Sequence, residues 1–120
     1  MLTNDTLPLY EIKANLFKGL AHPHRIRALE ILSTAREVSV AEMIAETGLE
    51  ASHLSQHLSV LRRYGLVHSE RRASVVYYRL ASPQVAELLL VARHLLTEML
   101  DAAQGNRSAA SALPPIPAER

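Results

Sequence analysis

The sequence predicts a mainly α-helical fold, a winged helix-turn-helix of about five helices and a two-stranded β-hairpin wing. Three observations carry this prediction: helical spacing of apolar residues over most of the 120-residue chain, a helix–turn–helix order across residues 40–64, and two β-rich runs directly after it. In the second helix of that pair, Leu54, Leu58 and Leu61 share one face. The serines and the glutamine between them lie off that face, so this helix has an apolar seam and a polar surface.

The first three helices are marked by their ends as well as by their periodicity. Apolar spacing predicts a helix over residues 8–20, and a proline then suits the first position of a second helix over about residues 23–35. Ser39 followed by Glu42 is the capping-box pattern at the start of a short third helix. Gly48 is the glycine expected just past the end of that helix.

The polar-faced helix spans about residues 50–64, and Gly65 stops it. The β-rich residues 66–71 and 75–80 predict an antiparallel hairpin, which is the wing. Residues 72–74 contain neither glycine nor asparagine, so we expect a loop longer than a tight primed turn.

A final helix begins with Ser82 as its N-cap and Pro83 at its first position. Between residues 85 and 100 its apolar residues cover more than the single stripe that packing on one domain needs. The excess predicts a two-fold symmetric homodimer formed by the first and last helices. The residues expected in that interface are Leu9, Ile12, Leu16, Leu89, Leu96 and Met99.

The net charge of +1 hides an uneven distribution. Residues 50–80 hold five arginines and two glutamates, whereas the other 89 residues hold eight basic and ten acidic side chains. Positive charge therefore collects on the polar-faced helix and the hairpin, as a surface that faces phosphates requires. An ordinary solvated face is the alternative, but the coincidence with the helix-turn-helix pattern favours double-stranded DNA as the partner.

Composition excludes several other classes of protein. The chain has no cysteine, which excludes disulfides, thiolate metal sites and cysteine nucleophiles. We see neither a secretion leader nor an apolar run long enough for a bilayer, so we expect a cytoplasmic protein with no membrane partner. Residues 1–103 are predicted to form one domain, and the proline-rich, aperiodic residues 104–120 a disordered tail.

Three stretches resemble, in order, the ArsR/SmtB family of bacterial winged helix-turn-helix regulators. Residues 17–27 are similar to the entry into the family's second helix, residues 54–67 to its recognition helix, and residues 76–80 to its second wing strand. The resemblance covers residues 9–100. It implies a homodimeric DNA-binding transcription regulator, usually a repressor, with activation as the open alternative.

The metal sites for which the family is known do not match this sequence. Where one family site has cysteines, this chain has Ser39 and Ala41. The other site has an Asp-x-His pair followed further along by His-x-x-Glu. If His94 takes the later histidine, the earlier pair falls on an alanine and a proline, and Thr97 replaces the glutamate. The resemblance therefore does not identify the signal.

The polar-faced helix and the wing supply the candidates for DNA contact. Gln56 can bond an adenine edge at two points, and the neighbouring serines and His53 can reach bases or phosphates. The arginines are candidate phosphate contacts, with solvated surface as the alternative. His57 lies beside the leucines of the seam, so we expect it to be half-buried and structural. At the wing tip, relatives often place Gly then Arg where this chain has Ala73 and Ser74. The candidate DNA-contacting residues are Ser52, His53, Ser55, Gln56, Ser59, Arg62, Arg63, Arg71 and Arg72.

One group of side chains on the last helix could hold a metal ion. His94 and Glu98 are one helical turn apart, and Asp101 follows. At a dimer interface, His22, His24 or N-terminal carboxylates from another helix would complete the site. Such nitrogen and oxygen ligands suit nickel, zinc or cobalt. We favour the alternative, an ordinary charged face of an exposed helix.

No arrangement of residues supports catalysis, because the sequence has no glycine-rich phosphate loop and no identifiable set of nucleophile, base and acid. We therefore predict a protein that is not an enzyme. We interpret it as a homodimeric, sequence-specific regulator of the ArsR type that binds an inverted-repeat operator and responds to an effector, with a divalent metal among the candidates. The alternative is a winged-helix protein-interaction or assembly dimer without specific DNA binding.

Overall fold

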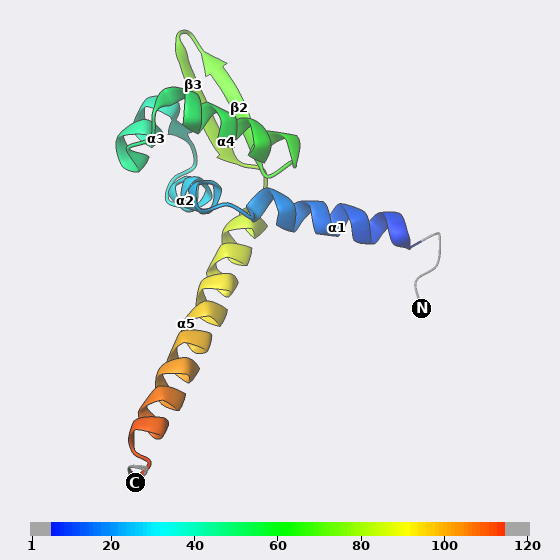
Figure 1. Cartoon of the computed structure of the whole chain (residues 1–120). Helices are drawn as coiled ribbons and strands as arrows, with labels where there is room; N and C mark the ends of the chain where they lie inside the picture. The colour runs from blue at the N-terminus through cyan, green and yellow to red at the C-terminus, as the bar shows by residue number, and fades with distance from the viewer. Residues whose placement is uncertain (1–5, 115–120) are drawn as a thin grey trace. The chain divides into compact units, whose positions relative to one another are not determined.

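The computed structural model describes residues 6–114 (Figure 1). In chain order its elements are α1 (Leu7–Leu20), α2 (Pro23–Leu32), β1 (Val38–Ser39), α3 (Val40–Thr47), α4 (Ala51–Arg63), β2 (Val67–Arg72), β3 (Val75–Leu80) and α5 (Pro83–Ser111). This mainly helical winged helix-turn-helix confirms the predicted fold class. The chain divides into two compact units within α5, the first ending at Leu89 and the second beginning at Leu90.

The core of the first unit lies between α2, α3, α4 and the base of the hairpin. The predicted seam of α4 is buried, since Leu54, Leu58 and Leu61 are each at most 1% exposed. They belong to one cluster with Leu29 of α2 and Met43 of α3. Full burial of such a side chain is worth about 1.5–3 kcal/mol. The seam therefore fixes α4 and leaves its opposite face toward solvent.

Three of the predicted helix ends are confirmed. Ser39 Oγ accepts a hydrogen bond from the backbone N–H of Glu42 at 3.1 Å, and the Ser39 hydroxyl donates to the Glu42 carboxylate at 3.1 Å. Gly48 follows α3 with a φ of 71°, a left-handed conformation that glycine adopts without strain. At the start of α5, Ser82 Oγ accepts from the backbone N–H of Gln84 at 3.2 Å.

Helix α2 ends at Leu32, before the predicted end near residue 35. The hydroxyls of Ser33 and Thr34 donate to the carbonyls of Leu29 and Ile31 at 2.8 and 2.7 Å. Side-chain bonds of this kind compete with continuation of a helix. Apolar periodicity does not register that competition, which is why the sequence predicted a longer helix.

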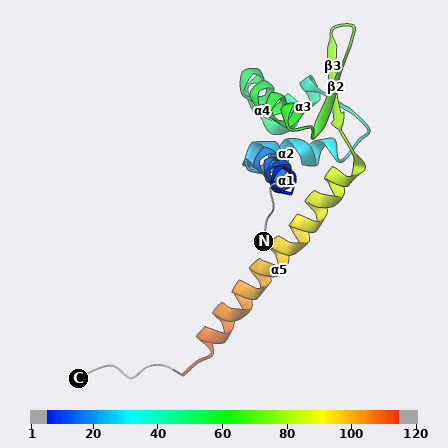
Figure 2. The ribbon, with the colours of Figure 1, turned by 90° about the vertical axis from the view of Figure 1, so that its right-hand side faces the viewer.

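The sheet has three strands, in the order β1-β3-β2, whereas the sequence predicted two. The extra strand, β1, pairs antiparallel with β3 through Val38 with Tyr78 and Ser39 with Tyr77. Two residues are too short to show the alternation by which strands are identified in sequence. Strands β2 and β3 form the predicted hairpin, and their tip projects beyond α3 and α4 in both views (Figures 1 and 2).

The hairpin turn is tight, so the longer loop predicted from the sequence is wrong. Arg72 and Val75 are paired, and only Ala73 and Ser74 connect the strands. Ala73 has a φ of 54° and is the one non-glycine residue with positive φ among the described residues. Positive φ at the first central position is the pattern of a type II′ turn, which usually has glycine there.

Helix α5 continues to Ser111, beyond the predicted end of the folded domain at residue 103. Residues 102–110 are rich in alanine, the residue with the highest helix propensity, and proline follows only at position 114. The first part of the predicted tail is therefore helical, and residues 115–120 lie outside the described residues. Within residues 6–114, no helix is both long and apolar enough to cross a membrane.

Candidate nucleic-acid interface

Helices α3 and α4 form the predicted helix-turn-helix, and α4 turns a polar strip away from the core. Ser52, Gln56, Ser59 and Arg63 are exposed and follow one another at steps of three or four residues, so they lie along one face. We call these four residues the outer strip. Within residues 6–114, its hydroxyl and amide groups have no hydrogen-bond partner. Hydroxyl, amide and guanidinium groups are the ones that contact base edges and phosphates.

The two flanks of α4 differ in what they contact. Toward the wing, Ser55 lines a recess between α3, α4 and the end of the hairpin. On the same side, Arg62 donates to Ser69 Oγ of β2 at 3.2 Å. On the other flank, His57 is half-buried, as predicted, and its ring lies 4.3 Å from that of His22. His53, a further candidate for DNA contact, lies one turn earlier on that flank and is exposed.

The two neighbouring arginines of the wing lie on opposite faces of the sheet, because successive residues of a strand alternate. Arg71 pairs with Val76, which lines the recess beside α4, so Arg71 is on the face toward α4. Arg72 lies on the other face, where Glu70 and Arg79 line a polar recess. The sequence proposed both arginines as phosphate contacts, but only Arg71 shares a face with α4.

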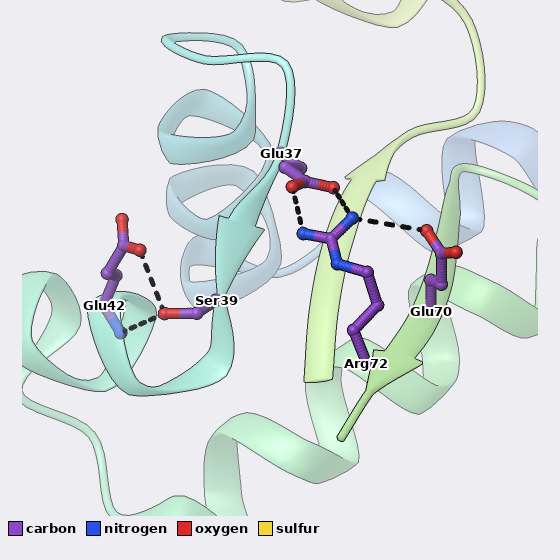
Figure 3. A network of polar contacts seen from close by, with 5 residues as sticks. All are labelled: Glu37, Ser39, Glu42, Glu70 and Arg72. Atoms are coloured by element: carbon purple, nitrogen blue, oxygen red, sulfur yellow. Dashed lines mark hydrogen bonds and ion pairs between the residues drawn. The ribbon is translucent and has the colours of Figure 1, made fainter. Parts of the chain in front are cut away.

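Glu37 binds the guanidinium of Arg72 (Figure 3). Nη1 donates to Oε2 of Glu37 at 3.0 Å, and Nη2 donates to Oε1. Nη1 also lies 3.6 Å from a carboxylate oxygen of Glu70, and the guanidinium lies 3.9 Å from the centre of the Tyr77 ring. The hydrogen bond from Arg72 is the main cause that lowers the pKa of Glu37, and Glu37 in turn raises the pKa of Arg72.

Glu37 and Tyr77 are the residues of this surface that sequence reasoning missed. Glu37 directly precedes β1, and it alternates with Ser39, whose cross-strand partner is Tyr77. Had β1 been recognised, that alternation would have placed Glu37 on the same face as Tyr77. Because β1 has two residues, no sequence signal was available for it.

The predicted metal ligands are not assembled within one chain. No group of three or more His, Asp or Glu side chains in the described part of the chain is arranged to hold a metal ion. His22 and His24 are bonded to each other, since Nδ1 of His22 accepts the backbone N–H of His24 at 3.1 Å. A site completed by a second subunit stays a prediction, and its candidates on α5 are exposed: His94, Glu98 and Asp101.

Exposed apolar side chains lie on both helices of the predicted dimer interface. Four of the six predicted residues are more than half exposed: Leu9, Ile12, Leu96 and Met99. The other two, Leu16 and Leu89, pack partly against the core of the first unit. Exposed apolar surface of this extent is typical of a surface that associates.

Residues 22–69 match the arsR family of bacterial regulatory proteins. The chain is 51% identical over 97 residues to the uncharacterized HTH-type transcriptional regulator Rv0081 of Mycobacterium tuberculosis, and the match covers 80% of this chain and 84% of the relative. It is 39% identical over 74 residues to the transcriptional activator HlyU of Vibrio cholerae, covering 62% of this chain and 68% of the relative.

Two solved structures share the fold. The crystal structure of Rv0081 superposes with a TM-score of 0.73 at 49% identity, covering 80% of this chain and 96% of that one. The solution structure of the homodimeric winged helix-turn-helix DNA-binding domain of Mb0332 from Mycobacterium bovis superposes with a TM-score of 0.73 at 28% identity, covering 82% of this chain and 90% of that one. The chain therefore belongs to the ArsR family of bacterial regulatory proteins, and it is a transcription regulator and not an enzyme.

Proposed function

We propose that this chain is a homodimer that binds an inverted-repeat operator sequence-specifically. The observation that carries the proposal is the outer strip of α4, whose polar groups face solvent because the leucine seam behind them is buried. The similarity to the Mb0332 domain, a homodimeric DNA-binding domain, supports it. So does the concentration of arginines on α4 and the wing.

Helix α4 would enter the major groove, which is about 12 Å wide and admits an α-helix. Gln56 lies in the middle of the outer strip, where its amide can donate to and accept from one adenine edge. Arg63 at the end of α4 and Arg71 on the adjacent face of the wing would neutralise phosphates on either side of that contact. Arg62 and Arg72 already have partners in the protein and would serve mainly to hold the wing.

Two copies related by a two-fold axis would present two α4 helices to one face of the duplex. The exposed apolar residues of α1 and α5 are the surface that we propose for this association. Symmetry then requires an inverted repeat with half-site centres about 34–36 Å apart, one turn of DNA. An effector would act by changing the angle between subunits. Titration of nickel or zinc into the full chain tests whether that effector is a divalent metal.

Substitution at Gln56 tests the proposal. Fragments of the source genome selected by the full chain would supply the operator, and mobility-shift titrations at two salt concentrations would measure affinity. Gln56→Ala should lower the preference for the operator over a variant at the contacted base by a factor that corresponds to about 1–3 kcal/mol. Gln84→Ala, at an exposed glutamine of α5 outside the interface, is the matched control.

Two results would contradict the proposal. If Gln56→Ala bound every operator variant as the unmodified chain does, the outer strip would not read bases. If the unmodified chain showed no salt-dependent binding to any selected fragment, the assembly-dimer alternative would replace the regulator.

We further propose repression as the mode of regulation, in a cytoplasmic protein. An operator occupied by a dimer of this size excludes other proteins from the same DNA, which requires no additional surface. HlyU is named an activator, so family membership alone does not determine the sign. Transcription from a promoter that overlaps the operator should fall when the chain is present. A rise in transcription would establish activation.

A further inference from the structure

A recess on the face of the sheet away from α4 brings five charged side chains together. Its volume is about 580 Å³, and the residues that line it are Arg36, Glu37, Glu70, Arg72 and Arg79. They come from the segment before β1, from β2 and from β3. We call it the basic recess, because its guanidiniums outnumber its carboxylates. Volumes of about 300–1,000 Å³ are typical of sites for small molecules.

Both carboxylates of the basic recess point toward the same guanidinium, that of Arg72 (Figure 3). Glu37 accepts hydrogen bonds from both terminal nitrogens of Arg72. A carboxylate oxygen of Glu70 lies 3.6 Å from Nη1 of the same side chain. The acidic groups of the recess are therefore engaged with one of its three cations, and neither is paired with the other two.

Arg36 and Arg79 are the two remaining cations of the basic recess. Both are exposed, and among the residues that the structure describes neither side chain makes a hydrogen bond or an ion pair. The hydrogen bond from Arg72 is the main cause that lowers the pKa of Glu37, and the charges of Arg36 and Arg79 contribute to that shift. The two guanidiniums are therefore close to one carboxylate, yet their N–H groups are available to another acceptor.

The chemistry of these two guanidiniums favours a phosphate monoester as the ligand. A guanidinium binds phosphate at two points through parallel N–H···O bonds. A phosphate monoester carries about two negative charges at neutral pH, so one such group can neutralise Arg36 and Arg79 together. A carboxylate, or the phosphodiester of a DNA backbone, carries a single negative charge and would leave one of the two cations unpaired.

The position of the basic recess favours a small molecule over DNA as the source of that phosphate. Arg71, the wing arginine that we place beside DNA, is on the sheet face toward α4, whereas the recess is on the opposite face. Arg79 is the last residue but one of β3 and pairs with His68, so it lies at the base of the hairpin. A duplex bound along α4 and the tip of the wing would therefore leave the recess open to solvent.

We propose that the basic recess binds the phosphate group of a small phosphomonoester, with Arg36 and Arg79 as its principal donors. A phosphate bound there stands beside the Arg72–Glu37 pair, where it attracts the guanidinium of Arg72 and repels the carboxylate of Glu37. Binding of the ligand therefore weakens the link between the end of β2 and the residue before β1. This route acts on the wing within one subunit and is separate from a change in the angle between subunits.

Titration of the full chain with methyl phosphate tests the site. The titration is done at about pH 7.5, where this monoester is doubly charged, and chloride keeps the ionic strength constant. Nuclear magnetic resonance of the guanidinium Nε–H groups reports binding in the unmodified chain, which does not depend on whether any variant folds. The resonances of Arg36 and Arg79 should shift as methyl phosphate is added. If neither shifted, the proposal would be overturned.

Substitutions at the two arginines measure their contribution. The dissociation constant for methyl phosphate should rise at least about tenfold in Arg36→Gln and in Arg79→Gln, because each change removes hydrogen bonds between charged groups. Arg79→Lys keeps the charge but not the two-point geometry, and it should also weaken binding. Arg107→Gln, at an exposed arginine of α5, removes the same charge elsewhere and is the matched control. Equal dissociation constants in the three glutamine variants would overturn the proposal.

Dimethyl phosphate distinguishes the two sources of phosphate, because it is a singly charged diester like the DNA backbone. It should bind at least about tenfold more weakly than methyl phosphate, since it neutralises only one of the two guanidiniums. If the two esters bound equally well, the recess would fit a DNA backbone, and its assignment to a small molecule would be overturned.

The effect on DNA rests on the proposed function, whereas the titrations without DNA do not. In the unmodified chain, methyl phosphate should lower operator affinity several-fold at constant ionic strength, and Arg79→Gln should abolish that response. Operator affinity that stayed constant while methyl phosphate bound would overturn the link to the wing. A chain that bound methyl phosphate but no DNA would disprove the proposed function and support the phosphate site.

Discussion

The guanidinium of Arg72 and the carboxylate of Glu37 connect the two outer strands of the sheet across the middle one. Arg72 ends β2, Glu37 directly precedes β1, and β3 lies between those strands. The guanidinium crosses β3 with the centre of the Tyr77 ring 3.9 Å away. The backbone ladder alone would leave the end of a two-stranded hairpin free to twist. The Arg72–Glu37 pair therefore adds a side-chain link between the end of β2 and the residue before β1.

Glu37→Gln should reduce operator affinity several-fold with little effect on overall stability, because exposed ion pairs contribute little to folding. The pKa of Glu37 is lowered from 4.5 in the folded chain, so its contribution is full above that pH and is lost as the pH falls below it. Affinity should therefore fall in the unmodified chain as the pH is lowered from 7 through the lowered pKa of Glu37, with a smaller change in the variant. Glu46→Gln is the control, because Glu46 of α3 pairs at 3.8 Å with Arg27 of α2 and not with a residue of the wing. Unchanged affinity in Glu37→Gln would show that the ladder alone positions the wing.

Arg71→Ala and Arg72→Ala should differ in the salt dependence of binding. Arg71 is exposed on the face toward α4, and as a phosphate contact it would account for about one unit of the slope of log affinity against log salt. Arg72 is engaged by Glu37, so its removal should weaken binding while leaving the slope nearly unchanged. This assignment departs from the sequence interpretation, which gave both arginines the same role. If the salt slope changed in Arg72→Ala and not in Arg71→Ala, Arg72 would be the residue that contacts phosphate.

Ala73→Gly should stabilise the chain. Ala73 has a φ of 54°, where a β-carbon is strained and glycine is not. The relief of strain exceeds the extra entropy that glycine gives the unfolded chain, so the free energy of unfolding should rise by about 0.5–1 kcal/mol. Urea unfolding measures this, with Ser74→Gly as the control because Ser74 does not have positive φ. An equal or greater gain in Ser74→Gly would contradict the assignment of strain to Ala73.

Leu96→Glu and Ile12→Glu should each shift the chain from dimer to monomer. Both side chains are more than half exposed, and a charge at the centre of an apolar interface is left unpaired when the interface forms. Sedimentation of the full chain over a range of concentrations measures the shift. Leu113→Glu is the control, since Leu113 is 69% exposed but follows the end of α5. If Leu113→Glu dissociated into monomers, or if neither Leu96→Glu nor Ile12→Glu did, the proposed interface would be wrong.

The sequence predicted the features that depend on periodicity and end signals. Leu54, Leu58 and Leu61 are buried as their spacing requires, and Ser39 and Gly48 begin and end α3 as their chemistry requires. These features are local, because each is decided by residues within two turns of a helix. For the same reason the outer strip of α4 was identified from its sequence alone.

What the sequence did not predict depends on contacts between distant residues. Glu37 and Arg72 are 35 positions apart, and their pairing follows from β1, a strand too short to be recognised. The tight turn at Ala73 is imposed by the ladder on either side of it, against the preference of alanine. The rings of His22 and His57 likewise come within 4.3 Å of each other through the packing of α2 on α4.

Arg25 holds the end of α1, and its replacement should loosen that helix. Its Nε donates to the carbonyl of Gly19 at 2.7 Å, and Nη2 donates to the carbonyl of Lys18 at 3.2 Å, which also accepts the backbone N–H of Ala21, so one side chain binds two carbonyls in the last turn of α1. Arg25→Met keeps much of the apolar stem but removes both bonds, which should cost about 1–2 kcal/mol of stability. Because α1 carries Leu9 and Ile12, the same change should raise the dimer dissociation constant.

Arg27→Met on the same helix is the matched control for that substitution. Arg27 is exposed and only approaches Glu46 at 3.8 Å, so its loss should leave stability nearly unchanged. Urea unfolding and sedimentation of both variants measure the two effects, and hydrogen exchange of the α1 amides locates them. Arg25→Met could lose stability while its α1 amides stayed as protected as in the unmodified chain. That result would show that Arg25 acts elsewhere. The nearest such place is the start of α2, where its charge also acts on His57.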